Sequence, residues 1–308
     1  MKVSVLIPSF NNATWLSACL QSCIDQGQLL HEIIVVDDHS TDNSWEVLQT
    51  WRDKYPETIK IFLNPEKGAN HARNYAFEQS TAHYIQWLDS DDRLLPGKFE
   101  KQIQPLLSGE ADIIYSDWQM DFWIDGQLSK SEQMTYKDNP DFLEELIKDN
   151  WTSPNNYLLT RGMAERLTGG IGWNPDTKIG QDREYFTMAG ILGARFKYVQ
   201  GVFAVYNKQT SGTISGMDFK KRLELNQVLE WRFGHEIDEQ VWIDPTKKRR
   251  YQNILDTHKL KACFYHQKIK LDKPISPFSI HWDLMHWKMR LALPLVYLRT
   301  HMVLLFSK

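Results

Sequence analysis

Short apolar runs alternate with amphipathic segments along the first third of the chain. Four segments have the composition of strands, and they span 3–7, 32–36, 60–63 and 84–88. Three of the four are largely apolar, as buried parallel strands are. Three segments with helical spacing lie between them, at 14–26, 44–54 and 70–80. This alternation predicts an α/β fold, a doubly wound and mostly parallel sheet flanked by helices and joined by right-handed crossovers.

Polar side chains gather where three of these strands end. The clusters occupy residues 8–12, 37–42 and 89–92. In doubly wound sheets, ligands bind outside the carboxyl ends of the strands. The three clusters therefore predict one binding site at that edge of the sheet.

The rest of the chain is mixed and then becomes helical. We expect strands at 112–118 and 195–206, with a hairpin turn at Asp125-Gly126. Helices are expected from Pro96 to Leu107 and at 140–150, 160–168 and 182–192, with a Ser/Gly/Thr loop at 210–216. From Met217 onward the pattern is helical and charged. The sequence therefore predicts a helical C-terminal extension over 216–308.

Composition narrows the class of protein. The 308 residues carry a net charge of −3, which gives no reason to expect nucleic acid as a partner. Cys19 and Cys23 lie one helical turn apart among apolar residues and are interpreted as core, and the odd total of three cysteines gives no disulfide framework. We therefore expect a reducing, cytoplasmic setting.

The tetrapeptide Asp89-Ser90-Asp91-Asp92 is the sharpest local feature. Carboxylates crowded at a strand end repel one another unless a cation or hydrogen-bond donors stabilise them. Oxygen-rich groups of this kind suit Mg²⁺ or Mn²⁺, which also bind substrate phosphates. The alternative is a solvated turn ahead of the next helix, but the second acidic turn at Asp37-Asp38 favours a site.

Four separated blocks of sequence resemble family-2 glycosyltransferases of the GT-A fold. They are VSVLIPSFN from Val3, IVVDDHSTD from Ile34, GANHARN from Gly68 and LDSDD from Leu88. The departure is His39, where the family usually has glycine or asparagine, and this change is expected to alter the turn. The resemblance covers roughly 1–215 and implies a nucleotide-binding half at 1–110 and an acceptor half at 111–215.

The resemblance also implies roles in binding a nucleotide-sugar donor. Pro8 and Phe10 would line the base pocket, and Asp38 would accept a hydrogen bond from the base. A carboxylate suits the N3–H of uracil or thymine, and the N1–H of guanine offers the same kind of donor. Asp89 would hold the ribose or the water shell of a metal ion, and Asp91 would coordinate the Mn²⁺ or Mg²⁺ that bridges the diphosphate.

Two further assignments come from the same resemblance. Arg73 is a candidate for contact with phosphate or with a carboxylate, against the alternative of a surface helix charge. Asp182 matches the catalytic base of the family's acidic acceptor segment, with Gln181 in place of the usual first acid, against the alternative of a plain helix cap. Trp118, Trp151 and Trp173 would either stack on the acceptor or fill the core.

The last 28 residues, 281–308, are basic and aromatic. Lys288, Arg290, Arg299 and Lys308 stand against Asp283, which gives +3 from four positive charges and one negative. No apolar stretch here is long enough to span a bilayer. The segment suits either a contact with the inner membrane face or packing against the protein.

Together these observations predict a metal-dependent, inverting glycosyltransferase. It would move a sugar from a nucleotide diphosphate, a UDP-sugar by preference, to a saccharide or lipid-linked hydroxyl in the synthesis of surface polysaccharide or glycolipid. A catalytically inactive sugar-binding module is one alternative. A nucleotidyltransferase is another, but the Gly-rich basic loop expected of it after the first strand is missing.

Overall fold

The sheet is built on four parallel strands with apolar sequences. The structure, a computed structural model, describes residues 2–150, 152–170, 172–209, 219–265, 275–276, 279–285 and 289–290. The parallel strands lie in the order β3-β2-β1-β4, and they are β1 (Val3–Ser9), β2 (Leu30–Asp37), β3 (Ile59–Leu63) and β4 (Tyr84–Trp87). Every residue of β1 and β4 is buried, as their continuous apolar runs require.

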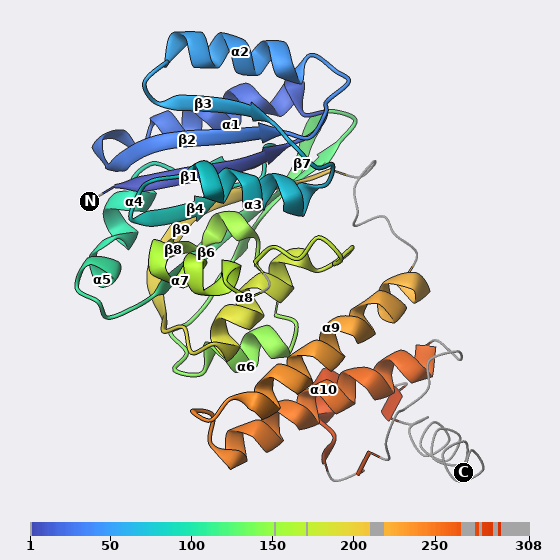
Figure 1. The fold of residues 1–308 in the computed structure, drawn as a ribbon. Helices are drawn as coiled ribbons and strands as arrows, with labels where there is room; N and C mark the ends of the chain where they lie inside the picture. Colours follow the sequence, from blue (N-terminus) through green and yellow to red (C-terminus); the bar gives the residue numbers. More distant parts are fainter. Residues whose placement is uncertain are drawn as a thin grey trace. The chain divides into compact units, whose positions relative to one another are not determined.

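Helices cover both faces of these strands. They are α1 (Ala13–Ile24), α2 (Ser44–Lys54) and α3 (Ala69–Gln79). In Figure 1, α3 crosses in front of the strands and α1 lies behind them. Cys19 and Cys23 on α1 are fully buried and belong to the apolar core beside β1 and β2, so their interpretation as core residues is confirmed. The predicted α/β architecture is confirmed as well.

The second half of the sheet mixes strand directions. Its strands are β5 (Arg93–Leu94), β6 (Ile113–Ile124), β7 (Gln127–Met134), β8 (Leu158–Thr160) and β9 (Phe196–Gln209). β8 is antiparallel to β4 and β6, whereas β9 runs parallel to β6 and antiparallel to β5. Asp125 and Gly126 have φ of 49° and 75°, as a two-residue hairpin turn requires, so that prediction is confirmed.

The helix expected from Pro96 to Leu107 is two short helices. They are α4 (Lys98–Gln102) and α5 (Gln104–Leu107), and α7 (Arg161–Thr168) follows β8 as predicted. Pro105 near the start of α5 has no N–H to continue the hydrogen bonds of α4, which explains the interruption. Two short 3₁₀ helices, η1 (Gly27–Leu29) and η2 (Pro154–Asn156), complete this part.

Glu32 ties the amino-terminal ends of the central strands together. It is buried, and it accepts hydrogen bonds from Ser4 Oγ, from Thr81 N and Oγ1 and from Lys60 Nζ. Burial alone raises the pKa of Glu32, but these donors outweigh burial and lower the pKa to about 2. A charged group inside the sheet is tolerated here because every neighbouring strand satisfies it.

The chain forms two compact units that are interleaved in sequence. The first contains Met1–Pro140, Thr152–Thr177 and Ala194–Thr213, and the second contains Asp141–Trp151, Lys178–Gly193 and Ile214–Lys308. The first unit holds the sheet. The proposed boundary at residue 215, and the division into halves at 110, remain predictions about domain organisation.

The second unit consists of helices connected by polar contacts between buried carboxylates and basic side chains. Its helices are α6 (Phe142–Ile147), α8 (Gln181–Ile191), α9 (Phe219–Glu239), α10 (Pro245–Tyr265) and the 3₁₀ helix η5 (Trp282–Leu284). Arg183 on α8 donates to Glu230 on α9 at 2.8 Å, and Glu230 also contacts His258 on α10 at 3.1 Å. Arg250 on α10 pairs with Glu144 on α6.

The C-terminal tail is described in part. Met285 and Met289 are buried in an apolar cluster with Leu260 and Cys263 of α10. Most of 281–308, where a membrane contact was predicted, lies outside the described residues, as does the predicted loop at 210–216. Within the described residues, no helix combines the length and apolar composition that crossing a bilayer requires.

Candidate active site

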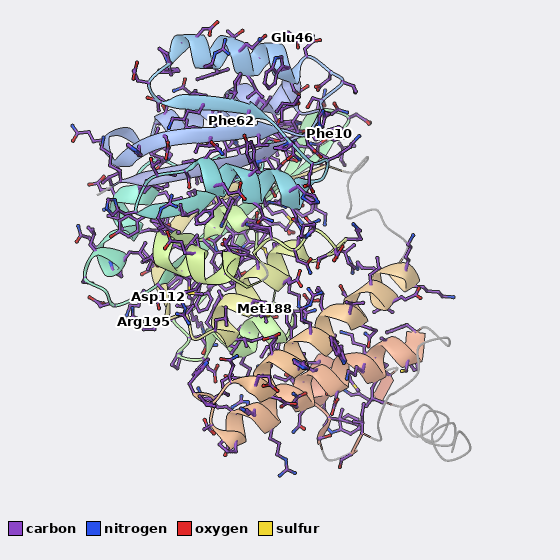
Figure 2. The ribbon with its side chains drawn as sticks, viewed as in Figure 1. Phe10, Glu46, Phe62, Asp112, Met188 and Arg195 are labelled. Carbon is purple, nitrogen blue, oxygen red and sulfur yellow. The ribbon has the colours of Figure 1, made fainter. Side chains whose placement is uncertain are left out.

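A pocket lies at the carboxyl ends of β1, β2 and β4. Its lining is Pro8, Ser9, Phe10, Asn12, Asp38, Ala69, Arg73, Asp89, Ser90 and Asp91. Figure 2 shows Phe10 at this edge of the sheet, beyond the end of β1. The structure thus brings together all six residues predicted for the donor and the metal, which are Pro8, Phe10, Asp38, Arg73, Asp89 and Asp91.

Hydrogen bonds fasten the first pocket loop to the second. The backbone N of Asn11 donates to Ser40 Oγ at 2.9 Å, and Asn11 Oδ1 accepts from Thr41 N at 2.7 Å. Asp37 accepts from the N and Oγ of Ser40, so its carboxylate shapes the turn. His39 in this turn has φ of 62°, a left-handed conformation that glycine and asparagine adopt at lower cost.

The carboxylate of Asp38 is held by the loop that precedes α3. It accepts from Asn64 Nδ2 at 2.7 Å and from the N of Gly68 at 2.8 and 3.0 Å. Gly68 has φ of 133°, a backbone angle that residues other than glycine rarely adopt. A carboxylate has about four acceptor positions, so Asp38 retains capacity for one more donor. Sequence reasoning missed Asn64.

Ser9 supplies a second polar group to the pocket that the sequence did not single out. The side chain is 1% exposed. Its Oγ has no hydrogen-bond partner among the described residues. A buried hydroxyl without a partner carries a desolvation cost, which a polar group of a ligand in this pocket would remove.

Arg73 is an internal residue and contacts a carboxylate. Its Nη2 donates to Asp89 at 2.8 Å and its Nη1 donates to Asn70 at 3.0 Å. The guanidinium lies 4.5 Å from the ring centre of Trp173, a favourable cation–π distance. The surface-charge alternative for Arg73 is therefore wrong.

The acidic turn is crowded and short of positive charge. Burial raises the pKa of Asp91, and the charge of Asp89 raises it further, to about 7; a backbone hydrogen bond and Arg73 oppose this rise. Burial, together with the charges of Asp91 and Asp89, holds the pKa of Asp92 well above its usual range. A divalent cation at Asp91 would relieve this repulsion, so the residues present fit Mn²⁺ or Mg²⁺. Among the described residues, no three His, Cys, Asp or Glu side chains converge as a complete protein shell, so phosphate or water oxygens would have to complete it.

Asp92 connects the acidic turn to distant parts of the same compact unit. Its carboxylate accepts from the N of Asn207 at 2.8 Å and from Asn155 Nδ2 at 2.8 Å, and Ser153 Oγ lies 3.4 Å away. These partners come from β9 and from the segment around η2, far from Asp92 in the sequence. No local pattern marked them in advance.

The tryptophans proposed as stacking walls have different outcomes. Trp118 and Trp173 are fully buried at 0% and 1% exposure, so both are core residues. Trp151 lies outside the described residues.

Asp182 lies in the second compact unit, in the first turn of α8. Gly180 precedes the helix with φ of 64°, and Asp182 Oδ1 accepts from the N of Arg183 at 2.9 Å. Asp182 is half-buried, whereas its neighbour Glu184 is 2% exposed and pairs with Arg232. The catalytic role of Asp182 stays a prediction.

Similarity to known proteins agrees with this geometry. The family model Glycosyl transferase family 2 matches residues 4–168. The chain is 33% identical over 136 residues to UDP-Glc:alpha-D-GlcNAc-diphosphoundecaprenol beta-1,3-glucosyltransferase WfaP of Escherichia coli, covering 44% of this chain and 53% of WfaP. It is 32% identical over 141 residues to the putative teichuronic acid biosynthesis glycosyltransferase TuaG of Bacillus subtilis, covering 44% and 56%. The chain thus spans about half the length of these curated relatives.

Solved structures show the same fold at low sequence identity. S. aureus TarS 1–349 in complex with UDP-GlcNAc has a TM-score of 0.67 at 18% identity, covering 87% of this chain and 74% of TarS 1–349. This likeness confirms the GT-A-like fold. Because the family model matches more than half of the 308 residues, the chain belongs to glycosyl transferase family 2.

Proposed function

We propose that this protein is an inverting glycosyltransferase that takes its sugar from a nucleotide diphosphate, with a UDP-sugar as the preferred donor. The observation that carries the proposal is the pocket, in which two apolar side chains, a carboxylate with spare acceptor capacity and a crowded acidic turn share one lining. A nucleotide diphosphate needs apolar contacts for its base, an acceptor for the N–H of the base, and a cation site beside its diphosphate. Family membership supports the same activity.

Each part of the donor has a partner in the pocket. The base lies against Pro8 and Phe10 and donates its ring N–H to Asp38. Asp89, oriented by its 2.8 Å contact with Arg73, faces the ribose or the metal's water shell. Asp91 holds Mn²⁺ or Mg²⁺, which when bound stabilises the negative charge of the leaving diphosphate. A mannosyltransferase of Pyrobaculum calidifontis with a TM-score of 0.54 was solved with GDP-Man and Mn²⁺, which supports a metal in this fold.

The transfer itself requires a base on the acceptor. In this proposal Asp182 removes the proton of the acceptor hydroxyl as that oxygen attacks the anomeric carbon. The bond to the diphosphate breaks on the opposite face of the sugar. In-line displacement of this kind inverts the anomeric centre.

A lipid-linked saccharide is the proposed acceptor. WfaP, by its name, glucosylates GlcNAc-diphosphoundecaprenol, and a Campylobacter jejuni relative, 34% identical over 114 residues, acts on GalNAc(5)-diNAcBac-PP-undecaprenol. With TuaG named for teichuronic acid biosynthesis, these relatives support a role in surface polysaccharide or glycolipid synthesis. We place the enzyme in the cytoplasm, in peripheral contact with the inner membrane face.

The proposed membrane contact runs through 281–308. Deleting this segment should release the protein from anionic vesicles at low salt, because basic and aromatic side chains bind the interface of such membranes. Nucleotide binding should persist. Co-sedimentation with vesicles measures the release, and circular dichroism checks the fold. The deletion also removes Met285 and Met289, which pack on α10. A second, full-length variant with Lys288, Arg290, Arg299 and Lys308 changed to glutamine keeps this packing and tests the basic charges alone. Vesicle binding equal to the parent in both variants would exclude the contact.

The donor is tested directly by a thermal-shift screen of nucleotide sugars with and without Mn²⁺. A ligand that binds only the folded state raises stability by about 2.7 kcal/mol at a hundred times its dissociation constant. We expect UDP-sugars to give the largest shift, and only with metal present. If neither UDP- nor GDP-sugars stabilise the protein under any metal condition, the proposed donor site is wrong.

A further inference from the structure

Asn207 on β9 reaches the acidic turn with both its backbone and its side chain. The N of Asn207 donates to Asp92 Oδ1 at 2.8 Å, and Asn207 Nδ2 donates to the carbonyl oxygen of Asp91 at 2.5 Å. The side chain is buried, with 2% exposure. One residue thus contacts two consecutive positions of the turn.

The amide of Asn207 is held in one orientation. Trp123 Nε1, near the end of β6, donates to Asn207 Oδ1 at 2.9 Å. With its oxygen occupied in this way, the amide turns its Nδ2 toward Asp91. The ring of Trp123 is in turn packed edge-on against Trp15 of α1, with centroids 4.8 Å apart. An amide reversed by 180° would set oxygen against oxygen at Asp91 and nitrogen against the indole N–H.

The backbone beside the turn is also joined to β9. Arg93 pairs with Val205 and Leu94 with Ala204 in the β5–β9 ladder, and the N of Leu95 donates to the carbonyl of Phe203. Asn207 continues this line of contacts beyond the ladder, to the two residues that precede Arg93. The ladder ends before Asp91, and beyond it the Asn207 amide connects β9 to the Asp91 peptide.

We propose that Asn207 is a positioning residue, oriented by Trp123, that sets where the Asp91 carboxylate stands in the pocket. The inference rests on the proposed function, because it takes Asp91 as the group that binds Mn²⁺ or Mg²⁺ beside the diphosphate. Metal sites require ligand distances within about 0.2 Å of their ideal values. If the Asp91 peptide is free to rotate, cation binding is therefore weaker even though the carboxylate itself is unchanged.

The test measures Mn²⁺ binding without turnover. Free Mn²⁺ is followed by electron paramagnetic resonance in the presence of UDP, and separately of GDP, for the full chain and three variants. Asn207→Leu keeps the volume and removes the amide, and we expect about tenfold weaker Mn²⁺ binding, the effect of losing one hydrogen bond to a buried group. Trp123→Phe removes the N–H that orients the amide, and we expect a smaller loss of severalfold.

Trp51→Phe is the matched control. Trp51 Nε1 donates to Ser17 Oγ at 3.1 Å between α2 and α1, so this change removes an equivalent indole bond that touches no pocket residue. Mn²⁺ binding in Trp51→Phe should equal that of the parent. Thermal melts of all variants separate loss of fold from loss of metal, and if Asn207→Leu does not fold, the contrast between Trp123→Phe and Trp51→Phe decides.

Two results would overturn the inference in distinguishable ways. Parent-like Mn²⁺ affinity in folded Trp123→Phe and Asn207→Leu would remove Asn207 from the positioning of Asp91 while leaving the proposed function intact. A parent protein that binds no Mn²⁺ with either nucleotide would contradict the metal site of the proposed function, and the inference with it.

Discussion

Replacing Asp91 by asparagine should abolish turnover and weaken Mn²⁺-dependent nucleotide binding. The substitution keeps the size of the side chain and removes the negative charge that the cation requires. Turnover should fall by at least about 10²-fold, the scale reported for removing one preorganised electrostatic contact to the developing charge. A transfer assay, or donor hydrolysis where the acceptor is unidentified, measures the first effect, and thermal shift with UDP and Mn²⁺ measures the second.

The pH dependence of the parent protein adds a second readout for the same residue. Metal binding needs the charged carboxylate, so protons compete with Mn²⁺ below the pKa of Asp91, which burial and Asp89 raise to about 7. Apparent Mn²⁺ affinity should decrease as the pH falls below that value, by up to about tenfold per pH unit, and should level off above it. In Asp91→Asn this dependence should disappear together with the affinity.

Asp112→Asn is a suitable control for Asp91→Asn. Asp112 belongs to the same compact unit, and its carboxylate pairs with Arg195 at 2.9 Å, away from the pocket lining (Figure 2). Its loss should change nucleotide binding very little, because neither Asp112 nor Arg195 lines the pocket. Metal-dependent turnover in Asp91→Asn at the level of the parent would mean that another group holds the cation.

The donor half of the site could be predicted from sequence because its residues follow apolar strands directly. Parallel strands bring their carboxyl ends to one edge, so Pro8, Asp38 and Asp91 had to meet once β1, β2 and β4 were recognised. The side chains that hold them could not be found in this way. Asn64, Asn155 and Asn207 belong to no repeating pattern, and their role appears only when distant segments fold together.

The strand directions of the second half were equally out of reach. β5 and β8 have two and three residues, too few to show any period. β8 reverses the direction of the sheet next to β4, and β5 is antiparallel to β9. The two compact units are also interleaved, because α6 and α8 join the C-terminal helices although they come from the middle of the chain. Sequence patterns report local periodicity, whereas the second unit contains contacts between distant segments, such as the ion pair of Arg183 with Glu230.

Asp182→Asn should lower kcat while leaving the donor half of the site intact. Asparagine keeps the size and the hydrogen bond to the N of Arg183, but it cannot accept the proton of the acceptor hydroxyl. We expect kcat to fall by about 10²-fold or more, the scale of lost general-base catalysis. Donor affinity should stay within about threefold of the parent, because an interaction made only in the transition state does not contribute to ground-state binding.

The matched control for Asp182→Asn is Asp244→Asn, in the same compact unit. Asp244 also accepts backbone N–H groups at the start of a helix: it precedes α10 and accepts from the N of Thr246 and of Lys247 in the first turn. Both substitutions therefore perturb a helix start in a similar way, and only Asp182→Asn should remove catalysis. Comparable losses of donor affinity in Asp182→Asn and Asp91→Asn would place Asp182 with the nucleotide instead. Retained transfer in Asp182→Asn would move the base elsewhere, and buried Glu184, already paired with Arg232, would need to lose that partner before it could take the role.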